Sequence, residues 1–127
     1  MNITISEDCG NAPKKAFLRD FNIAFAENNI AQLLDSVTDD FTWELIGNTT
    51  YHGKEAFGKV LAGMLDSKAT ELVIRDILTH GDIGAIHGSM SFDDGSTVAF
   101  CDICTFNSHA KDAKIKAMTS YGIELKK

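Results

Sequence analysis

The sequence is poor in basic residues and has no long apolar run. Twelve lysine and arginine residues stand against eighteen aspartate and glutamate residues, which gives a formal net charge of −6 at pH 7. Because nucleic acids and anionic membranes carry the same sign of charge, neither is an expected partner. No run approaches the roughly 18 apolar residues that span a bilayer, and the first residues lack the basic start and apolar stretch of a secretory signal. These absences predict a cytoplasmic protein.

Cysteine and histidine are too few and too scattered to predict a disulfide framework or a metal site. The three cysteines, Cys9, Cys101 and Cys104, are odd in number, which favours reduced thiols. Cys101 and Cys104 are three residues apart in one predicted strand, so they face opposite ways and are expected to be structural. No two of the four histidines have the spacing of metal ligands on a helix or strand. A glycine-rich phosphate loop and a nucleotide fingerprint are absent as well, so neither a metal ion nor a cofactor is expected.

Proline occurs once, and its position marks the start of a helix. Pro13 precedes phenylalanine residues at helical spacing, which predicts an amphipathic helix over residues 13–27 that ends at an Asn-Asn pair. Similar apolar spacing predicts helices over residues 30–37 and 54–65. Gly53 precedes the third helix and is expected to have a positive φ.

Alternating apolar and polar residues predict strands in the rest of the chain. The strand patterns lie at 41–47, 70–79, 83–92, 96–106 and 114–125. Turns at 93–95 and 107–112 join the last three strands into an antiparallel meander. Helices before a long antiparallel run indicate the α+β class, in the order α-α-β-α-β-β-β-β, with three helices on one face of a curved, mostly antiparallel sheet. Residues 1–12 show no pattern and are expected to form a flexible arm before a single domain over residues 13–127.

One carboxylate lies in the most apolar of the predicted strands. Asp102 shares a strand face with Phe100 and Cys104, which would remove water from it and raise its pKa. A protonated carboxyl group of this kind could donate a hydrogen bond to a ligand carbonyl or act as an acid. A structural aspartate, bonded to a hydroxyl of a neighbouring strand or to a helix terminus, would fit the same pattern. The residues alone leave both interpretations open.

Four stretches, taken in order, resemble one known superfamily. They are NNIAQLLDSVTDDFTWE (Asn28 to Glu44), YHGKEA (Tyr51 to Ala56, after Gly47), CDICTF (Cys101 to Phe106) and KIKAMTSYG (Lys114 to Gly122). They resemble the nuclear-transport-factor-2-like (NTF2-like) superfamily, and within it the SnoaL-like proteins and the ketosteroid isomerases, over about residues 14–125. The resemblance implies a cystatin-like α+β fold, a cone-shaped barrel with a deep pocket, and a homodimer formed through the open sheet face.

The catalytic groups of ketosteroid isomerases can be carried over one position at a time. Those enzymes use a carboxylate base on the first strand, a tyrosine on the first helix and a protonated aspartic acid on the penultimate strand. By the resemblance, the tyrosine position falls on Phe21 and the aspartic acid position on Asp102. The base position falls on Leu45, or on Glu44 after a shift of one residue. Steroid isomerisation is therefore not expected. The same arrangement makes Ser120 a cross-strand neighbour of Asp102.

Two functions follow from these residues. The first is binding of a small, largely apolar molecule in an internal pocket, with Asp102 as its polar anchor. The predicted pocket residues, most of them apolar, are Phe21, Trp43, Leu45, Phe57, Leu61, Met90, Cys104, Met118 and Ser120. The second is an isomerase, cyclase or hydrolase that uses Asp102 as general acid, with Glu44 as a further catalytic candidate. Because acid–base catalysis normally needs two groups with opposed roles, binding is the favoured hypothesis.

Overall fold

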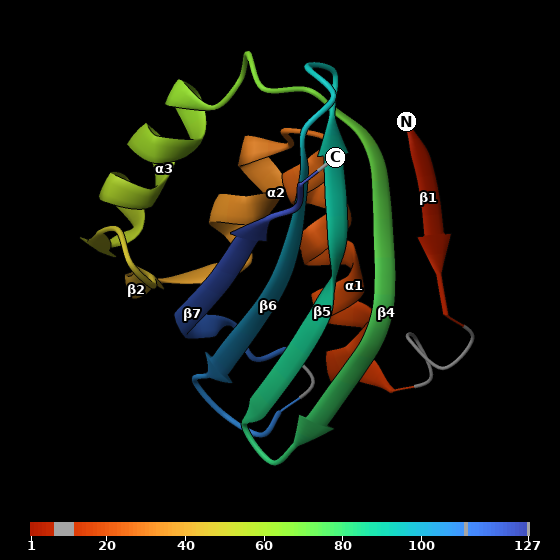
Figure 1. Ribbon diagram of the computed structural model, residues 1–127. Helices are drawn as coiled ribbons and strands as arrows, with labels where there is room; N and C mark the ends of the chain where they lie inside the picture. Colours follow the sequence, from red (N-terminus) through yellow and green to blue (C-terminus); the bar gives the residue numbers. More distant parts are fainter. Residues whose placement is uncertain (7–11, 111, 127) are drawn as a thin grey trace.

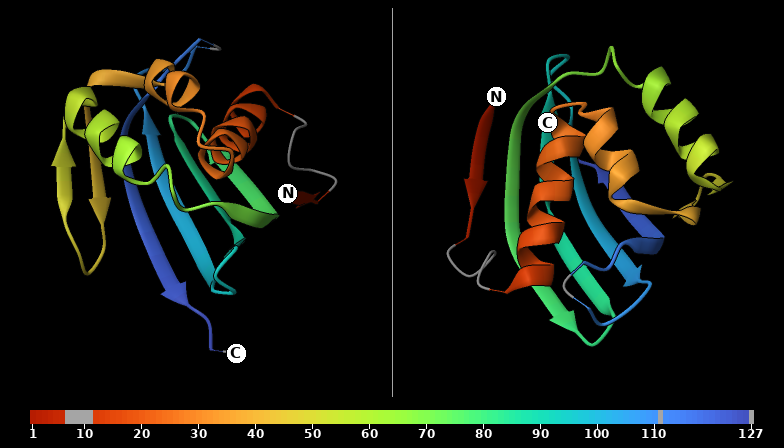
Figure 2. Two further views of the ribbon diagram at one scale, coloured as in Figure 1. Left: turned by 90° about the horizontal axis from the view of Figure 1, so that it is seen from above. Right: turned by 180° about the vertical axis from the view of Figure 1, so that it is seen from behind.

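A computed structural model describes residues 1–6, 12–110 and 112–126, which form three helices and a seven-stranded sheet. The helices are α1 (Pro13–Ala26), α2 (Ile30–Asp35) and α3 (Lys54–Gly63). The strands are β1 (Asn2–Ile5), β2 (Val37–Leu45), β3 (Thr50–His52), β4 (Ala69–His80), β5 (Ile83–Phe92), β6 (Thr97–Phe106) and β7 (Ile115–Glu124). The sheet is strongly curved, and α1 and α2 lie across one of its faces while α3 stands beside β2 (Figures 1 and 2).

The sheet is mostly antiparallel, with one parallel pair near each edge. Its strand order is β1-β4-β5-β6-β7-β2-β3. The strands β5 to β7 form the antiparallel meander that the turn pattern predicts, and β4 extends it as an antiparallel neighbour of β5. In contrast, β1 runs parallel to β4 and β2 runs parallel to β7. The α+β class and the placement of three helices on a curved sheet are therefore confirmed. No helix of the described residues is long and apolar enough to cross a membrane.

Two short strands are absent from the expected order. Asn2–Ile5 pairs with β4, so the expectation of a flexible arm over residues 1–12 is wrong for this segment, while residues 7–11 lie outside the described part of the chain. Thr50–His52 pairs with β2, although its polar neighbourhood predicts a loop. Runs of three or four residues are too short to show a period in the sequence, so only their pairing partners reveal them.

The helix boundaries follow local backbone signals. Pro13 is the first residue of α1, and Asn28 adopts a φ of 57° just after that helix ends. Gly53 has a φ of 92° before α3, as expected. The second helix is shorter than the pattern predicts, because the buried Val37 belongs to β2 and not to α2. The parallel pairing with β7 thus begins two residues after the helix stops.

A bulge in β4 changes which residues face the core. Strict alternation along residues 70–79 would place Ile77 on the face opposite Ile74, yet both side chains are buried. The register shifts between Ile74 and Asp76, which inserts one extra residue and turns Ile77 inward. Gly88 of β5 lies opposite this point, and a Cβ atom there would overlap the carbonyl oxygen of Val73. The close approach of two backbones therefore requires glycine at this bend.

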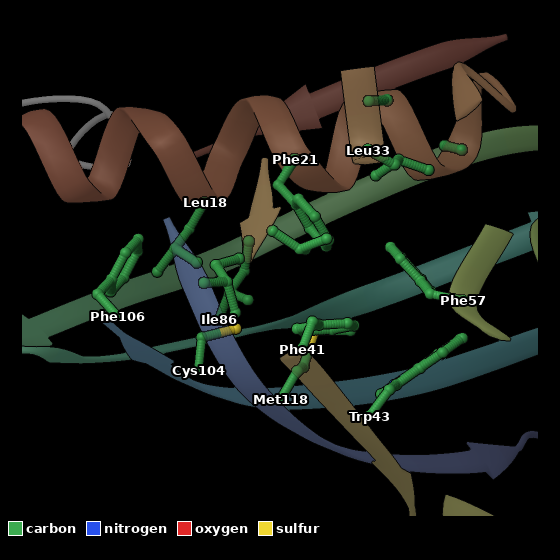
Figure 3. Close-up of a cluster of buried hydrophobic side chains, with 14 of the residues drawn as sticks. Leu18, Phe21, Leu33, Phe41, Trp43, Phe57, Ile86, Cys104, Phe106 and Met118 are labelled. Carbon is green, nitrogen blue, oxygen red and sulfur yellow. The ribbon is translucent and has the colours of Figure 1, made fainter. Parts of the chain in front are cut away.

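The core lies between the helices and the sheet. Figure 3 shows Leu18 and Phe21 extending from α1 towards side chains from the strands, among them Ile86 and Met118. Leu18 and Ile86 are almost completely buried. The burial of Trp43 and the phenylalanines around it continues this core towards α3.

Replacing Gly88 with alanine should destabilise the fold markedly. The added methyl group forces β4 and β5 apart at the bulge, and we expect the free energy of unfolding to fall by about 2 kcal/mol or more, by analogy with overpacked cores. Urea denaturation measures this loss. Gly63→Ala is the matched control, because nothing lies within 4 Å of a Cβ at Gly63, and it should be neutral or stabilising by up to about 1 kcal/mol. Equal stability of the two variants would contradict the close-approach argument.

Candidate functional site

A cavity of about 410 Å³ opens between the helices and the sheet. Its volume lies within the range of roughly 300–1,000 Å³ that is typical of small-molecule pockets. The lining comes from α1, α3 and five of the strands and is largely apolar: Phe21, Asn22, Phe25, Trp43, Leu45, Asn48, Tyr51, Val60, Met64, Met90, Phe92, Val98, Phe100, Asp102, Met118, Ser120, Tyr121 and Gly122. Residues far apart in the sequence thus line one cavity.

The structure brings most of the predicted pocket residues to this cavity. Those that line it are Phe21, Trp43, Leu45, Met90, Asp102, Met118 and Ser120. Phe57 and Cys104 are instead fully buried in the core outside the lining, and Leu61 borders a second cavity of about 400 Å³. Their assignment as contacts for a ligand of the main cavity is therefore corrected. Phe57 supports the cavity indirectly, because its ring packs 5.4 Å from the ring of Trp43.

Glu44 does not belong to the cavity. It is exposed on β2, between Trp43 and Leu45. The side chains of these two neighbours point to the other face of the sheet and line the cavity. The shift of one residue that would bring Glu44 inward does not occur, since Trp43 pairs with Met118 and Leu45 with Ser120 in regular register. The candidate role of Glu44 as a catalytic base is thus wrong.

Several lining residues escaped the sequence prediction although a signal existed for them. Phe25 follows Phe21 by four positions on α1, so the two share a helix face. Phe100 precedes Asp102 by two positions on β6 and points the same way. Asn22 gave no such signal: its Nδ2 donates to the carbonyl oxygen of Leu18 at 3.0 Å, and the residue is buried at the cavity wall.

Asp102 is held by a short chain of polar groups. It lies directly across the ladder from Ser120, which in turn pairs with Leu45. The indole Nε1 of Trp43 donates to the Ser120 hydroxyl oxygen at 2.9 Å. Because the indole N–H is only a donor, the hydroxyl proton of Ser120 is left for Asp102, and a hydrogen bond joins these two side chains. The order of donation is therefore Trp43 to Ser120 to Asp102.

The protonation state of Asp102 follows from its burial. Loss of water raises its pKa from the ordinary 3.8 to about 6, and the hydrogen bond from Ser120 lowers it in part. At pH 7 the carboxylate form exceeds the acid form by roughly tenfold. Asp102 is therefore mainly a hydrogen-bond acceptor at neutral pH, whereas the sequence pattern predicted a protonated donor.

Trp43 is the centre of an aromatic cluster on the cavity wall. The rings of Phe25 and Tyr51 each lie 6.0 Å from it, and the ring of Phe57 lies 5.4 Å away. The rings of Phe25 and Phe57 pack edge-on against the indole and that of Tyr51 is tilted, and together these contacts fix the indole orientation. The donor of the polar chain is thus held by the same residues that shape the cavity.

The two described cysteines do not offer a nucleophile. Cys104 is buried, and burial raises the pKa of its thiol well above the ordinary value. Burial, and then the charge of Asp102, raise the pKa of Cys101, which lies on the opposite face of β6. Both thiols therefore stay protonated at neutral pH. Cys9 lies outside the described residues, and within residues 1–6, 12–110 and 112–126 no group of three or more His, Cys, Asp or Glu side chains could hold a metal ion.

Comparison with known protein families identifies the family of this chain. Residues 18–118 match the family described as SnoaL-like domain. The match spans most of the sequence, so the chain belongs to the SnoaL-like domain family. None of the curated proteins matches the chain significantly.

Solved structures share its fold at low sequence identity. An NTF2-like protein of unknown function from Burkholderia xenovorans LB400 aligns with a TM-score of 0.74 at 18% identity, over 91% of this chain and 86% of that one. One from Cytophaga hutchinsonii ATCC 33406, also of unknown function, has a TM-score of 0.65 at 22% identity, over 85% and 97%. An LEH-like epoxide hydrolase from M. tuberculosis has a TM-score of 0.72 at 15% identity, over 85% and 80%.

Replacing Asp102 with asparagine should stabilise the fold at neutral pH. Because the folded-state pKa is raised from 3.8 to about 6, the native state binds more protons than the unfolded state between these values, and the free energy of unfolding falls as pH rises through this window. The full shift corresponds to about 3 kcal/mol. The difference in the free energy of unfolding between Asp102→Asn and wild type should be about 2 kcal/mol more favourable to the variant at about pH 7.5 than at about pH 4. Urea denaturation at the two pH values measures this difference.

Glu44→Gln is the control for this stability measurement, because it removes one carboxylate of the same charge from an exposed position. Its stability should stay close to wild type at both pH values. If Asp102→Asn were instead destabilised by the same amount at both pH values, Asp102 would be a structural hydrogen-bond partner and not a desolvated carboxylate.

Proposed function

We propose that this SnoaL-like protein binds a small, largely apolar molecule in the cavity beneath α1, with Asp102 as the polar anchor. The observation that carries the proposal is a buried carboxyl group in the wall of a largely apolar cavity. A carboxylate at this position lowers the stability of the fold, because desolvation opposes its charge. A purely structural hydrogen bond to Ser120 could be made by a neutral asparagine without that cost.

The anchor has unused capacity for a ligand. A carboxylate can accept about four hydrogen bonds, and one hydrogen bond, from Ser120, acts on Asp102. As the carboxylate faces the cavity, the remaining lone pairs are available to an O–H or N–H group of a bound molecule. The apolar lining then supplies most of the binding energy, while Asp102 fixes the orientation.

An isomerase, cyclase or hydrolase is the second candidate, and one observation favours it. A carboxyl group with a pKa of about 6 is well matched to proton transfer near neutral pH, as a base more than as an acid. However, the described lining residues include no second carboxylate and no histidine, lysine or arginine that could take the opposed role. Binding therefore remains the preferred function. If the wild-type protein hydrolysed styrene oxide and Asp102→Asn did not, the enzymatic function would become the preferred one.

Binding can be tested with 4-phenylbutanol, a neutral molecule with an apolar body and one hydroxyl group. Trp43, the single tryptophan of the chain, lines the cavity and should report occupancy through a saturable change in fluorescence. Asp102→Asn should weaken binding about tenfold, because a hydrogen bond to a charged acceptor is lost. Glu44→Gln should leave the affinity unchanged. Binding that is insensitive to Asp102→Asn would contradict the anchor role.

The outer face of the sheet supports a second proposal, that of a homodimer. Ile103, Tyr121 and Ile123 are exposed there, on the adjacent strands β6 and β7 and on the side opposite Asp102. Neighbouring apolar side chains that remain in water favour association with a similar surface. The two sheet faces would then have separate roles, the concave one for a ligand and the outer one for a second copy.

Ile123→Glu should shift the dimer towards the monomer. The charge would lie within the proposed contact, so we expect the molar mass from light scattering to fall towards 13.8 kDa at a concentration where wild type is dimeric. Ile46→Glu, at an exposed position in the turn after β2, is the matched control and should remain dimeric. A monomeric wild-type protein at high concentration would exclude this interface.

A further inference from the structure

The cavity is unbalanced in charge. Asp102 is the one carboxylate among the described lining residues, and no lysine, arginine or histidine lines the same space. The other titratable side chains on this side of the sheet are the phenol of Tyr51 and the thiol of Cys104, and neither supplies a positive charge near neutral pH. The side chains of Cys101 and Tyr121, which pair across the ladder, lie on the outer face. The carboxylate therefore has a neutral hydrogen-bond partner in Ser120 but no cation beside it.

A bound molecule must change the hydration of this carboxylate. An apolar or neutral ligand displaces water from the cavity and increases the desolvation of Asp102. A ligand with a positive charge displaces the same water and replaces it with an opposite charge at short range, where the low dielectric strengthens the attraction. The cavity thus penalises anionic ligands, accepts neutral ones at a cost, and compensates cationic ones.

The aromatic wall favours the same kind of ligand. Phe25 and Tyr51 flank Trp43 with ring centroids 6.0 Å from it on the cavity side of the sheet. An ammonium group within about 6 Å of an aromatic ring is attracted by the negative face of the ring, most strongly by tryptophan. Because Trp43 also donates to Ser120, which contacts Asp102, the aromatic wall and the carboxylate lie within one connected group of residues.

We infer that the natural ligand is a cationic amphiphile, an amine with an apolar body whose protonated nitrogen lies against the Asp102 carboxylate. This inference rests on the proposed binding function and specifies the chemistry of its ligand. The apolar part contacts Phe21, Met90 and Met118, and the ammonium group donates to the lone pairs that Ser120 leaves free. Binding then neutralises a charge that is desolvated in the empty cavity, so ligand and fold stabilise each other.

Three probes with one skeleton and different head groups test the inference: 4-phenylbutylamine, 4-phenylbutanol and 4-phenylbutyrate. At about pH 7.5 the amine should bind at least tenfold more tightly than the alcohol, and the carboxylate should bind most weakly. Lowering the pH to about 5.5 should weaken amine binding about fourfold, because Asp102 takes up a proton while the amine stays charged. Alcohol binding should weaken less, because a protonated carboxyl group can still exchange a hydrogen bond with the hydroxyl group.

Asp102→Asn separates a local from a general electrostatic effect. In this variant the amine should lose its advantage, with affinities for amine and alcohol within about threefold of each other. Glu44→Gln removes the same amount of charge from the outer face and should keep the tenfold preference. A preference that persists in Asp102→Asn would arise from the net charge of −6 and would overturn the inference.

The outcomes for the two proposals are distinct. If the alcohol binds as tightly as the amine and depends on Asp102, the proposed function stands and the cationic ligand is wrong. If none of the three probes binds to the wild-type protein, the proposed function fails together with the inference. If the amine binds more tightly and the preference follows both Asp102 and pH, both proposals are supported.

Discussion

The register between β6 and β7 is the constraint on which the candidate site depends. It sets Asp102 opposite Ser120, and the next strand, β2, brings Trp43 within hydrogen-bonding distance of the same hydroxyl group. A slip of one residue would turn Asp102 to the outer face and bring Cys101 or Ile103 inward. Buried apolar residues on either side, such as Cys104 and Met118, make that slip unfavourable. Core packing thus fixes the position of the polar group.

The site places a destabilising buried carboxylate, Asp102, among well-packed side chains and strands. Asp102 loses hydration without gaining a cation, which raises its pKa and lowers stability at neutral pH. The aromatic rings around Trp43 and the continuous ladder from β4 to β7 hold it in place despite this. Such a carboxylate responds to whatever enters the cavity, because it is the strongest unbalanced charge there. The fold alone does not assign a reaction, and the similar solved structures include both proteins of unknown function and an epoxide hydrolase.

The sequence predicted well those elements that are long enough to show a hydrophobic period or that begin or end at a characteristic residue. Helix α1, the meander and the turns at Gly53 and Asn28 each have strong local signals. The elements that were missed depend on contacts between distant segments. Strands β1 and β3 exist because β4 and β2 offer them free edges. The bulge in β4 reverses the facing of Ile77, and its partner Gly88 lies on another strand.

By itself, the sequence determined the α+β class and the burial of Asp102 on an apolar face of its strand, because hydrophobic periodicity and turn residues act locally. It also supported the resemblance that made Ser120 a neighbour of Asp102. Only the tertiary structure decided that Glu44 faces outward, that Phe57 and Cys104 lie behind the cavity wall, and that Asp102 is mainly ionised. These properties depend on which charges and rings surround a group in space. Neighbours of that kind come from several strands and helices at once, and no stretch of the sequence contains them together.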